Sequence, residues 1–258
     1  MSDTEAAEST PAHRDPATHV LRGVLLAIGA VVALAIAWLG LAYASSPASI
    51  RHPQATHYHF RLQLLVNSAA VNFGKAPFQE SEAGVCSEDL TSEPIHFHDN
   101  LDQFVHIHWN GMTGGLLLKN YGWNLISGPD DTLGYRFDQL PKLTRVPIHG
   151  HDLPKPPADA HYYTYTSTIT DPTAYRERSW NDFLHQDLHT FFGAKTSTSW
   201  LNQLVPSAYA HGDDDKLAAL NDVLGNVVVF VQKTPPAPAQ IKARFEHLIP
   251  LPESTCGG

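Results

Sequence analysis

The chain has 258 residues, which is enough for one large or two modest domains with a buried core. Its 17 lysines and arginines are outnumbered by 26 aspartates and glutamates, so the formal net charge is −9 at pH 7. This acidic balance argues against a nucleic-acid-binding protein, which normally needs a basic surface. The chain also has 16 histidines, almost as many as its lysines and arginines together, and this excess is what a function has to explain.

The N-terminal part predicts a polar tail followed by a membrane-spanning segment. Residues 1–22 are mostly small and polar, which is typical of a disordered tail. Residues 23–44, GVLLAIGAVVALAIAWLGLAYA, carry no charged side chain and match the roughly 20 residues that a helix needs to cross a bilayer. We therefore expect an uncleaved single-pass anchor. The alternative is a cleaved signal peptide, because Ala42-Tyr43-Ala44 resembles a signal-peptidase site.

The residues that flank the apolar segment indicate its orientation. Arg14 and Arg22 precede it and Arg51 follows it, so the positive-inside bias favours an N-terminus in the cytoplasm. Residues 45–56 are then predicted to be a short linker. Residues 57–258 are predicted to form a histidine-rich domain outside the cytoplasm, held at the membrane through the one helix.

Residues 57–66 alternate polar and apolar side chains, which predicts a β-strand with one buried face. Asn67-Ser68 supplies a turn, and residues 69–73 return as a second strand. Side chains along a strand alternate between two faces, so His57 and His59 both lie on the polar face of the first strand.

A second predicted hairpin, residues 94–109, carries two more His-x-His pairs. His96 and His98 lie on its first strand, and His106 and His108 lie on its second. Cross-strand neighbours of an antiparallel hairpin share a face, so we expect all four imidazoles on one side. A register slip of one residue would divide them between the two faces. Both hairpins are expected in one sheet, although the sequence does not determine whether the three pairs meet.

The three histidine pairs predict a transition-metal site. Clustered neutral imidazoles offer nitrogen donors of the kind that copper and zinc prefer, and these are the two metals we expect. Asp99 and Asp102, in the loop of the second hairpin, are predicted to hold ligand rings in place by hydrogen bonds. The alternative is a set of surface histidines on the solvated face of a sheet. The candidate ligands are His57, His59, His96, His98, His106 and His108.

Histidines elsewhere in the chain have simpler explanations. The segment 149–152, HGHD, could be a flexible ligand arm, but a polar turn is favoured. A helix is predicted over residues 173–192, with His185 and His189 one turn apart. Position 186 is glutamine, whereas the zinc metalloprotease motif requires glutamate there, so that chemistry is excluded.

The remaining predicted elements contribute no candidate metal ligand or catalytic residue. Thr113 is expected to cap a short helix over residues 114–121, and Met112 just before it is expected to pack in the core. The aromatic and threonine-rich segment 162–170 and the apolar segment 226–232 predict strands.

The two cysteines, Cys86 and Cys256, are expected to form one disulfide. Outside the cytoplasm thiols are readily oxidised, and two cysteines most simply pair with each other. The bond would tie the C-terminal tail to the loop before the second hairpin. A two-cysteine redox centre is the alternative, but the chain lacks a Cys-x-x-Cys arrangement.

Together these features predict an α+β domain with a mainly antiparallel sheet, β-hairpins and two or three helices, preceded by one transmembrane helix. The favoured function is binding of copper or zinc by the histidine face, as a carrier, a sensor or an accessory subunit of a membrane complex. One alternative is a metal-dependent enzyme with three histidine ligands and an aspartate base. Another is an interaction module whose histidines respond to pH without any metal.

Overall fold

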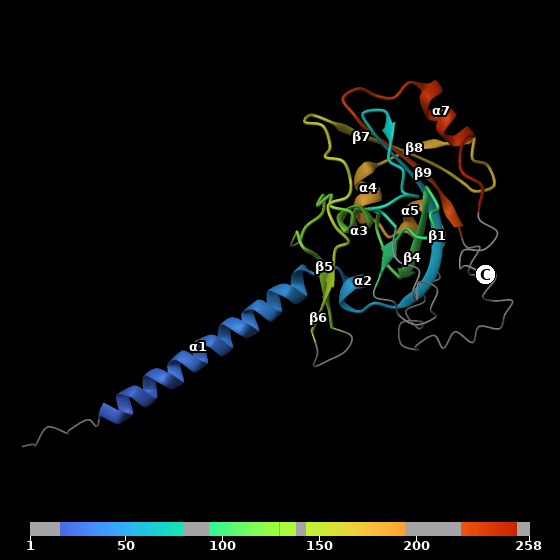
Figure 1. Ribbon diagram of the computed structural model, residues 1–258. Coiled ribbons are helices and arrows are strands. Elements are labelled where there is room, and N and C mark those ends of the chain that lie inside the picture. The colour runs from blue at the N-terminus through green and yellow to red at the C-terminus, as the bar shows by residue number, and fades with distance from the viewer. Residues whose placement is uncertain (1–15, 80–92, 129, 138–142, 194–222, 252–258) are drawn as a thin grey trace, which may run out of the picture. The chain divides into compact units, whose positions relative to one another are not determined.

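A computed structural model of the chain describes residues 16–79, 93–128, 130–137, 143–193 and 223–251 (Figure 1). It contains two compact units, residues 1–44 and residues 45–258.

The first unit consists of helix α1 (Pro16–Ser45), the expected apolar N-terminal helix. Its stretch His19–Ser45 contains an apolar window, with a mean hydropathy of 2.7, in which no residue is buried. Leu34, for example, is 70 % exposed. An exposed apolar side chain is unfavourable in water but favourable in the hydrocarbon core of a bilayer. Among the described residues α1 is the one helix long and apolar enough to span a membrane, and both an anchor and a signal peptide satisfy that test.

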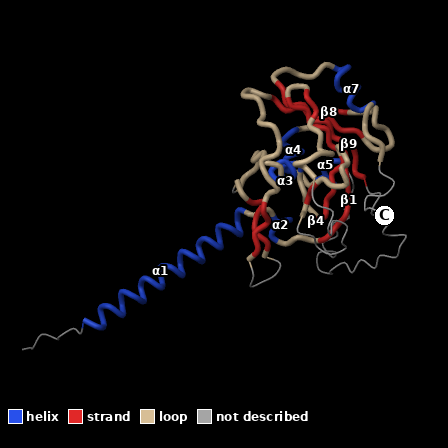
Figure 2. The backbone as a smooth tube through the Cα atoms, in the orientation of Figure 1, coloured by secondary structure: helices blue, strands red, loops and turns tan. Residues whose placement is uncertain are grey.

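The second unit is built on a mixed sheet, drawn in red in Figure 2, whose strand order is β3-β4-β1-β9-β7-β8, with β2 paired to β1. The pair β1–β9 is parallel and the other pairs are antiparallel. A separate ribbon pairs β5 with β6. The strands are β1 (Ala55–Val66), β2 (Ala69–Ala70), β3 (Ile95–His96), β4 (Phe104–Trp109), β5 (Thr132–Arg136), β6 (Thr144–Pro147), β7 (His161–Ser167), β8 (Arg176–Arg178) and β9 (Val223–Gln232).

Short helices complete the α+β fold, which confirms the predicted fold class. They are α2 (Ala48–Arg51), α3 (Gly114–Asn120), α4 (Trp180–His185), α5 (Leu188–Phe192) and α7 (Pro238–Glu246). Helix α3 lies where the sequence predicted it, and the Thr113 side chain caps it by accepting a hydrogen bond from the Leu116 amide. The segment 45–56, expected to be a linker, contains α2, whose Ile50 is fully buried.

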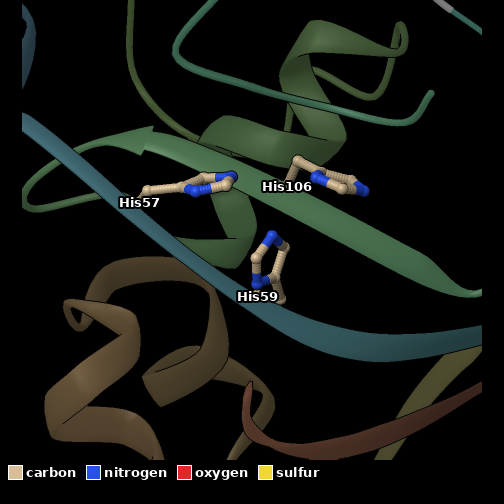
Figure 3. Close-up of side chains that lie close together, drawn as sticks. All are labelled: His57, His59 and His106. Carbon is tan, nitrogen blue, oxygen red and sulfur yellow. The ribbon is translucent and has the colours of Figure 1, made fainter. Parts of the chain in front are cut away.

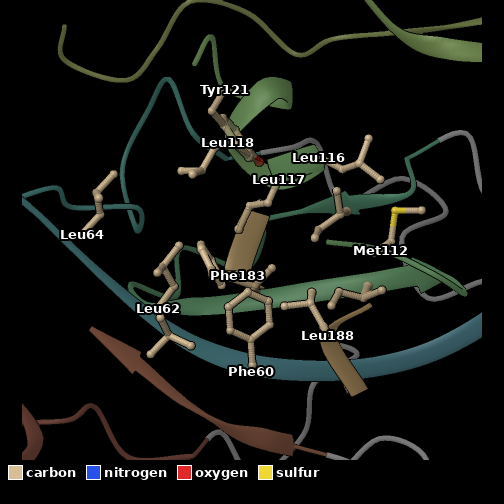
Figure 4. Packing of buried hydrophobic residues seen from close by; sticks show 14 of the residues in the cluster. Phe60, Leu62, Leu64, Met112, Leu116, Leu117, Leu118, Tyr121, Phe183 and Leu188 are labelled. Carbon is tan, nitrogen blue, oxygen red and sulfur yellow. The ribbon is translucent and has the colours of Figure 1, made fainter. Parts of the chain in front are cut away.

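Strand β1 separates the main core from the polar face of the sheet. Its alternate side chains Tyr58, Phe60, Leu62 and Leu64 belong to a buried cluster together with residues of α3, α4 and α5 (Figure 4). On its other face Leu65 packs with Ile241 and Phe245 of α7. His57 and His59 lie further along that second face, as the alternation predicted.

The prediction of one helix over residues 173–192 is wrong. Residues Arg176–Arg178 form strand β8, and two separate short helices, α4 and α5, follow it. Each helix has its own cap: the Ser179 hydroxyl accepts a hydrogen bond from the Asp182 amide, and the Asp187 carboxylate accepts from the His189 and Thr190 amides. These two cap residues start new helices inside a segment that the sequence predicted to be one helix.

Candidate metal centre

Three neighbouring strands place histidines in one row across the sheet. In the antiparallel pair β1–β4, His59 lies opposite His106, and in the antiparallel pair β3–β4, His96 lies opposite the same His106. The row is therefore His96, His106 and His59, with their side chains on one face. His108, His57 and His98 are each two residues from a member of this row, so the side-chain period brings them to that face as well. The predicted register and the shared sheet are confirmed.

Within this face, His57, His59 and His106 form a cluster that could hold a metal ion. Their nearest ring nitrogens all lie within 4.8 Å of one another. Figure 3 shows the three side chains close together, His57 and His59 from β1 and His106 from β4. His59 and His106 are fully buried, and His57 is partly buried. Three imidazoles at this separation can share one zinc or copper ion, since each needs a bond of about 2 Å to it.

The other three candidate histidines continue the face toward the edge strand β3. Ring centroids are 5.0 Å apart for His57 and His108, 5.0 Å for His96 and His108, and 5.2 Å for His96 and His98. The His98 ring lies 3.6 Å from that of His106. Two imidazoles on one tetrahedral zinc have centroids about 5 Å apart, because each bond is about 2 Å long. The spacings near 5 Å are compatible with two rings on one ion, whereas the 3.6 Å between His98 and His106 is a direct ring contact.

The buried ring nitrogens are short of hydrogen-bond partners. Within the described part of the chain, neither nitrogen of His96 or His106 has a partner, and the same holds for Nε2 of His57 and of His108. Buried polar atoms are almost always hydrogen-bonded, and each exception calls for an explanation. A ring nitrogen without a donor or acceptor keeps its lone pair for a metal ion, so the residues present fit copper or zinc.

Burial and mutual repulsion keep these imidazoles neutral. Burial lowers the pKa of His57 from 6.5 to about 4 and that of His108 to about 3, and neighbouring histidines add a smaller effect of the same sign. Burial also lowers the pKa of His96 and of His106 well below the usual value. A neutral imidazole is the form that binds metal, so at neutral pH protons hardly compete with an ion for these four side chains.

The two aspartates predicted to support the site differ in what they contact. The Asp99 carboxylate Oδ2 lies 2.7 Å from Nδ1 of His98, the position from which a carboxylate can orient a metal-binding imidazole. The Asp102 carboxylate accepts a hydrogen bond from the Phe73 amide at 2.8 Å, so it fastens the segment after β2 to the hairpin loop. A role for Asp102 beside a ligand ring stays a prediction.

Replacing Asp99 with asparagine is expected to weaken metal binding about 10-fold, the lower end of the effect of losing a supporting carboxylate. Asparagine suits the backbone here, because Asp99 has φ of 60° and asparagine tolerates the left-handed region. A competition titration with a chromophoric chelator measures the change. The matched control is Asp102→Asn, which keeps an oxygen acceptor for the Phe73 amide and is expected to leave affinity unchanged. Equal effects of the two substitutions would refute the supporting role of Asp99.

The remaining predicted site features lie elsewhere. Met112 is fully buried in the main core, on the opposite side of the sheet from the histidines. His185 and His189 fall on different helices, α4 and α5. Cys86 and Cys256 lie outside the described residues, so their disulfide stays a prediction. Sequence reasoning underrated His149, whose Nδ1 lies 2.6 Å from the Asp152 carboxylate. The signal for this pair was the aspartate three residues after the histidine.

Comparison of the chain with protein-family models, with curated proteins and with solved structures finds no match. The assignment of the site therefore depends on the residues and geometry described above.

Proposed function

We propose that this protein binds copper or zinc at its histidine face, outside the cytoplasm, on an N-terminal membrane anchor. The observation that carries the proposal is the buried cluster of His57, His59 and His106, whose ring nitrogens lie within 4.8 Å of one another. Burying three imidazoles together is costly unless their nitrogens find partners. A bound ion supplies such a partner to His106, whose ring nitrogens have none among the described residues.

The donor set favours a divalent ion. It consists of imidazole nitrogens, which suit Zn²⁺ and Cu²⁺, whereas carriers of Cu(I) favour thiolate or thioether sulfur. The chain has only two methionines, Met1 and Met112, and Met112 lies in the core on the other side of the sheet. For one set of nitrogen ligands Cu²⁺ binds more tightly than Zn²⁺, so we expect copper to displace zinc from the purified protein.

A carrier or accessory role fits better than a purely structural metal. A structural zinc site has four fixed ligands, and the face offers six candidate histidines. With more histidines than one ion needs, the ion can exchange between different sets of ligands. His57 is the member of the cluster that keeps some exposure to solvent, so it is the natural point at which an ion enters or leaves.

The membrane anchor supports the proposed location. The apolar window of α1 is exposed, and Arg14 and Arg22, before the apolar segment 23–44, favour a cytoplasmic N-terminus. Residues 45–258 would then lie outside the cytoplasm, where the anchor keeps the metal site close to a membrane partner such as a transporter or an enzyme complex.

The pH-sensing alternative is less well supported. It requires solvent-exposed histidines that gain charge between about pH 5 and 7. The histidines of the row are fully buried, and the pKa of His57 is lowered to about 4 and that of His108 to about 3.

The enzyme alternative would need a substrate pocket beside the histidines. Of the two surface hollows described, one lies beside α7 and the other beside residues 245–251, so neither supplies that pocket.

The test is a metal titration of the full-length chain in detergent, purified without a nickel column and stripped with a chelator. The wild type is expected to bind Zn²⁺ and Cu²⁺, and a variant with His57, His59 and His106 changed to alanine is expected to lose most of that affinity. The matched control changes His161, His185 and His247 to alanine, three exposed histidines away from the face. Equal affinity in the two triple variants would refute the proposal.

A further inference from the structure

Arg61 is a buried cation that lacks an acidic partner. It lies on β1, two residues beyond His59, and is only 6 % exposed. Its Nη1 donates a hydrogen bond to the Asn226 side-chain oxygen at 3.1 Å, whereas its Nε has no hydrogen-bond partner. Among the described residues no carboxylate forms an ion pair with the guanidinium. A buried charge without a counter-charge is costly, so a bound anion would stabilise this side chain.

Asn226 holds the guanidinium in a fixed orientation. It is fully buried, and its side-chain amide nitrogen donates hydrogen bonds to the Ser167 hydroxyl at 3.0 Å and to the Thr168 carbonyl at 2.9 Å. These two bonds direct the amide oxygen of Asn226 toward Nη1 of Arg61. Nε and Nη2 form the other edge of a guanidinium, and such an edge binds a carboxylate through two parallel hydrogen bonds. The arrangement is therefore preorganised for a planar anion.

Arg61 lines a surface hollow with a volume of about 310 Å³, which lies at the lower end of the range of ligand pockets. Most of the other walls are apolar, with Ile169 and Pro172 from the loop between β7 and β8, and Leu248 and Ile249 from the segment after α7. None of the six candidate histidines lines it. One cation among apolar walls suits a ligand with a single negative charge and an apolar body. A phosphate group, with up to two charges and three acceptor oxygens, would need more donors.

Glu246 is the second charged residue that lines the hollow. Its side chain is 42 % exposed, and its Oε1 lies 3.4 Å from Nζ of Lys242, so Lys242 and not Arg61 is its ion-pair partner. Burial lowers the pKa of Arg61 from its usual value, but a guanidinium stays protonated at neutral pH. The hollow thus keeps its buried cation, and the Glu246 carboxylate opposes an incoming anion only from an exposed position.

We propose that this hollow binds a small monocarboxylate with an apolar body, which places its carboxylate on Arg61 and its apolar part against the walls. The site is distinct from the histidine face and requires no metal ion, so it goes beyond the proposed function. Asn226 orients the cation, and the apolar walls exclude water from the ion pair and strengthen it.

Benzoate is a suitable probe because it is planar, small and soluble in water. Binding of radiolabelled benzoate to the full-length chain in detergent would be measured by equilibrium dialysis. The protein would be stripped of metal and dialysed free of chelator, so that no bound ion can hold the carboxylate. Benzamide, which has nearly the same shape without the charge, is the matched control ligand. We expect benzamide to bind at least about 10-fold more weakly, as expected for the loss of a hydrogen-bonded charge.

Two substitutions are expected to change benzoate affinity in opposite directions. Arg61→Met removes the cation and keeps a long apolar side chain, and it is expected to weaken binding about 10-fold or more. Glu246→Gln removes the like charge from the wall and is expected to tighten binding. The matched control is Lys233→Met, which alters net charge as Arg61→Met does. Lys233 is exposed and follows the opposite end of β9 from Asn226, so its loss is expected to leave affinity unchanged.

Each outcome decides the matter. A wild type that does not bind benzoate, or that binds benzamide equally well, overturns the inference. So does an Arg61→Met variant that keeps the wild-type affinity and circular dichroism spectrum. If Arg61→Met does not fold, the exposed Glu246→Gln decides, and an unchanged or weaker affinity for benzoate overturns the site. None of these results bears on the metal site, because the measurement is made without metal.

Discussion

Changing His106 to leucine is expected to affect metal binding and stability in opposite directions. His106 is the middle of the histidine row, it is fully buried, and neither ring nitrogen has a hydrogen-bond partner within the described residues. Replacing an unsatisfied buried polar group by an apolar one of similar size removes a desolvation cost, so the metal-free protein should gain about 1–2 kcal/mol in free energy of unfolding.

The same substitution removes a central ligand. Loss of a supporting group typically lowers metal affinity about 10- to 100-fold, and loss of a ligand should exceed that range. An ion that binds only the folded state adds about 2.7 kcal/mol of stability at 100 times its dissociation constant. We therefore expect zinc to raise the unfolding free energy of the wild type by about this amount under those conditions and to leave that of His106→Leu nearly unchanged.

Urea unfolding of the full-length chain, with zinc and with a chelator, measures both effects. The matched control is Ile107→Val on the same strand, whose side chain points to the main core. It is expected to lose about 0.5–1.5 kcal/mol through its missing methylene and to keep the stabilisation by zinc. A His106→Leu variant that is less stable than the wild type without metal, yet still stabilised by zinc, would refute the role assigned to His106.

Acid is expected to destabilise the metal-free protein over a defined range. In the unfolded chain a histidine has a pKa near 6.5, whereas in the folded protein burial lowers the pKa of His57 to about 4 and that of His108 to about 3. Below pH 6.5 the unfolded chain therefore takes up protons that the folded protein does not. The free energy of unfolding is at its full value above pH 6.5, and it falls as the pH drops from 6.5 toward these folded-state values.

The slope is large because several histidines act together. Each one that is protonated only in the unfolded chain lowers the free energy of unfolding by about 1.4 kcal/mol per pH unit. Urea unfolding from pH 8 to pH 5 in the presence of a chelator measures the slope. His57→Gln and His108→Gln are each expected to reduce it, and His161→Gln, an exposed histidine, is expected to leave it unchanged. A flat profile in the wild type would show that these imidazoles are solvated.

The local features of the histidine face could be predicted from the sequence. Alternating side chains in residues 57–66 and 94–109 determine which residues share a face, because the period of a strand is two. The turn residues between the strands then fix the hairpin register. That reasoning predicted the four histidines of the second hairpin on one side, and the pairing of His96 with His106 confirms it. Thr113 likewise predicted the start of α3.

Contacts between distant segments could not be predicted in this way. The three histidine pairs meet because β4 pairs with both β3 and β1, and β1 belongs to a different hairpin from β3 and β4. No local pattern encodes such a neighbour. Burial of the histidine face was missed for the same reason, since polar side chains on a strand usually face water. The Asn120 side chain links the His149 amide to the Ile95 carbonyl of β3, and this contact has no sequence signature.

The metal content of the protein as it is isolated from cells tests the central claim most directly. The full-length chain would be purified in detergent without a nickel column, and its copper and zinc would be counted by mass spectrometry, beside the variant with His57, His59 and His106 changed to alanine. We predict stoichiometric copper or zinc in the wild type and a clear loss in a variant that keeps its circular dichroism spectrum. A wild type that is isolated without metal and also fails to take up added Cu²⁺ or Zn²⁺ would contradict the account.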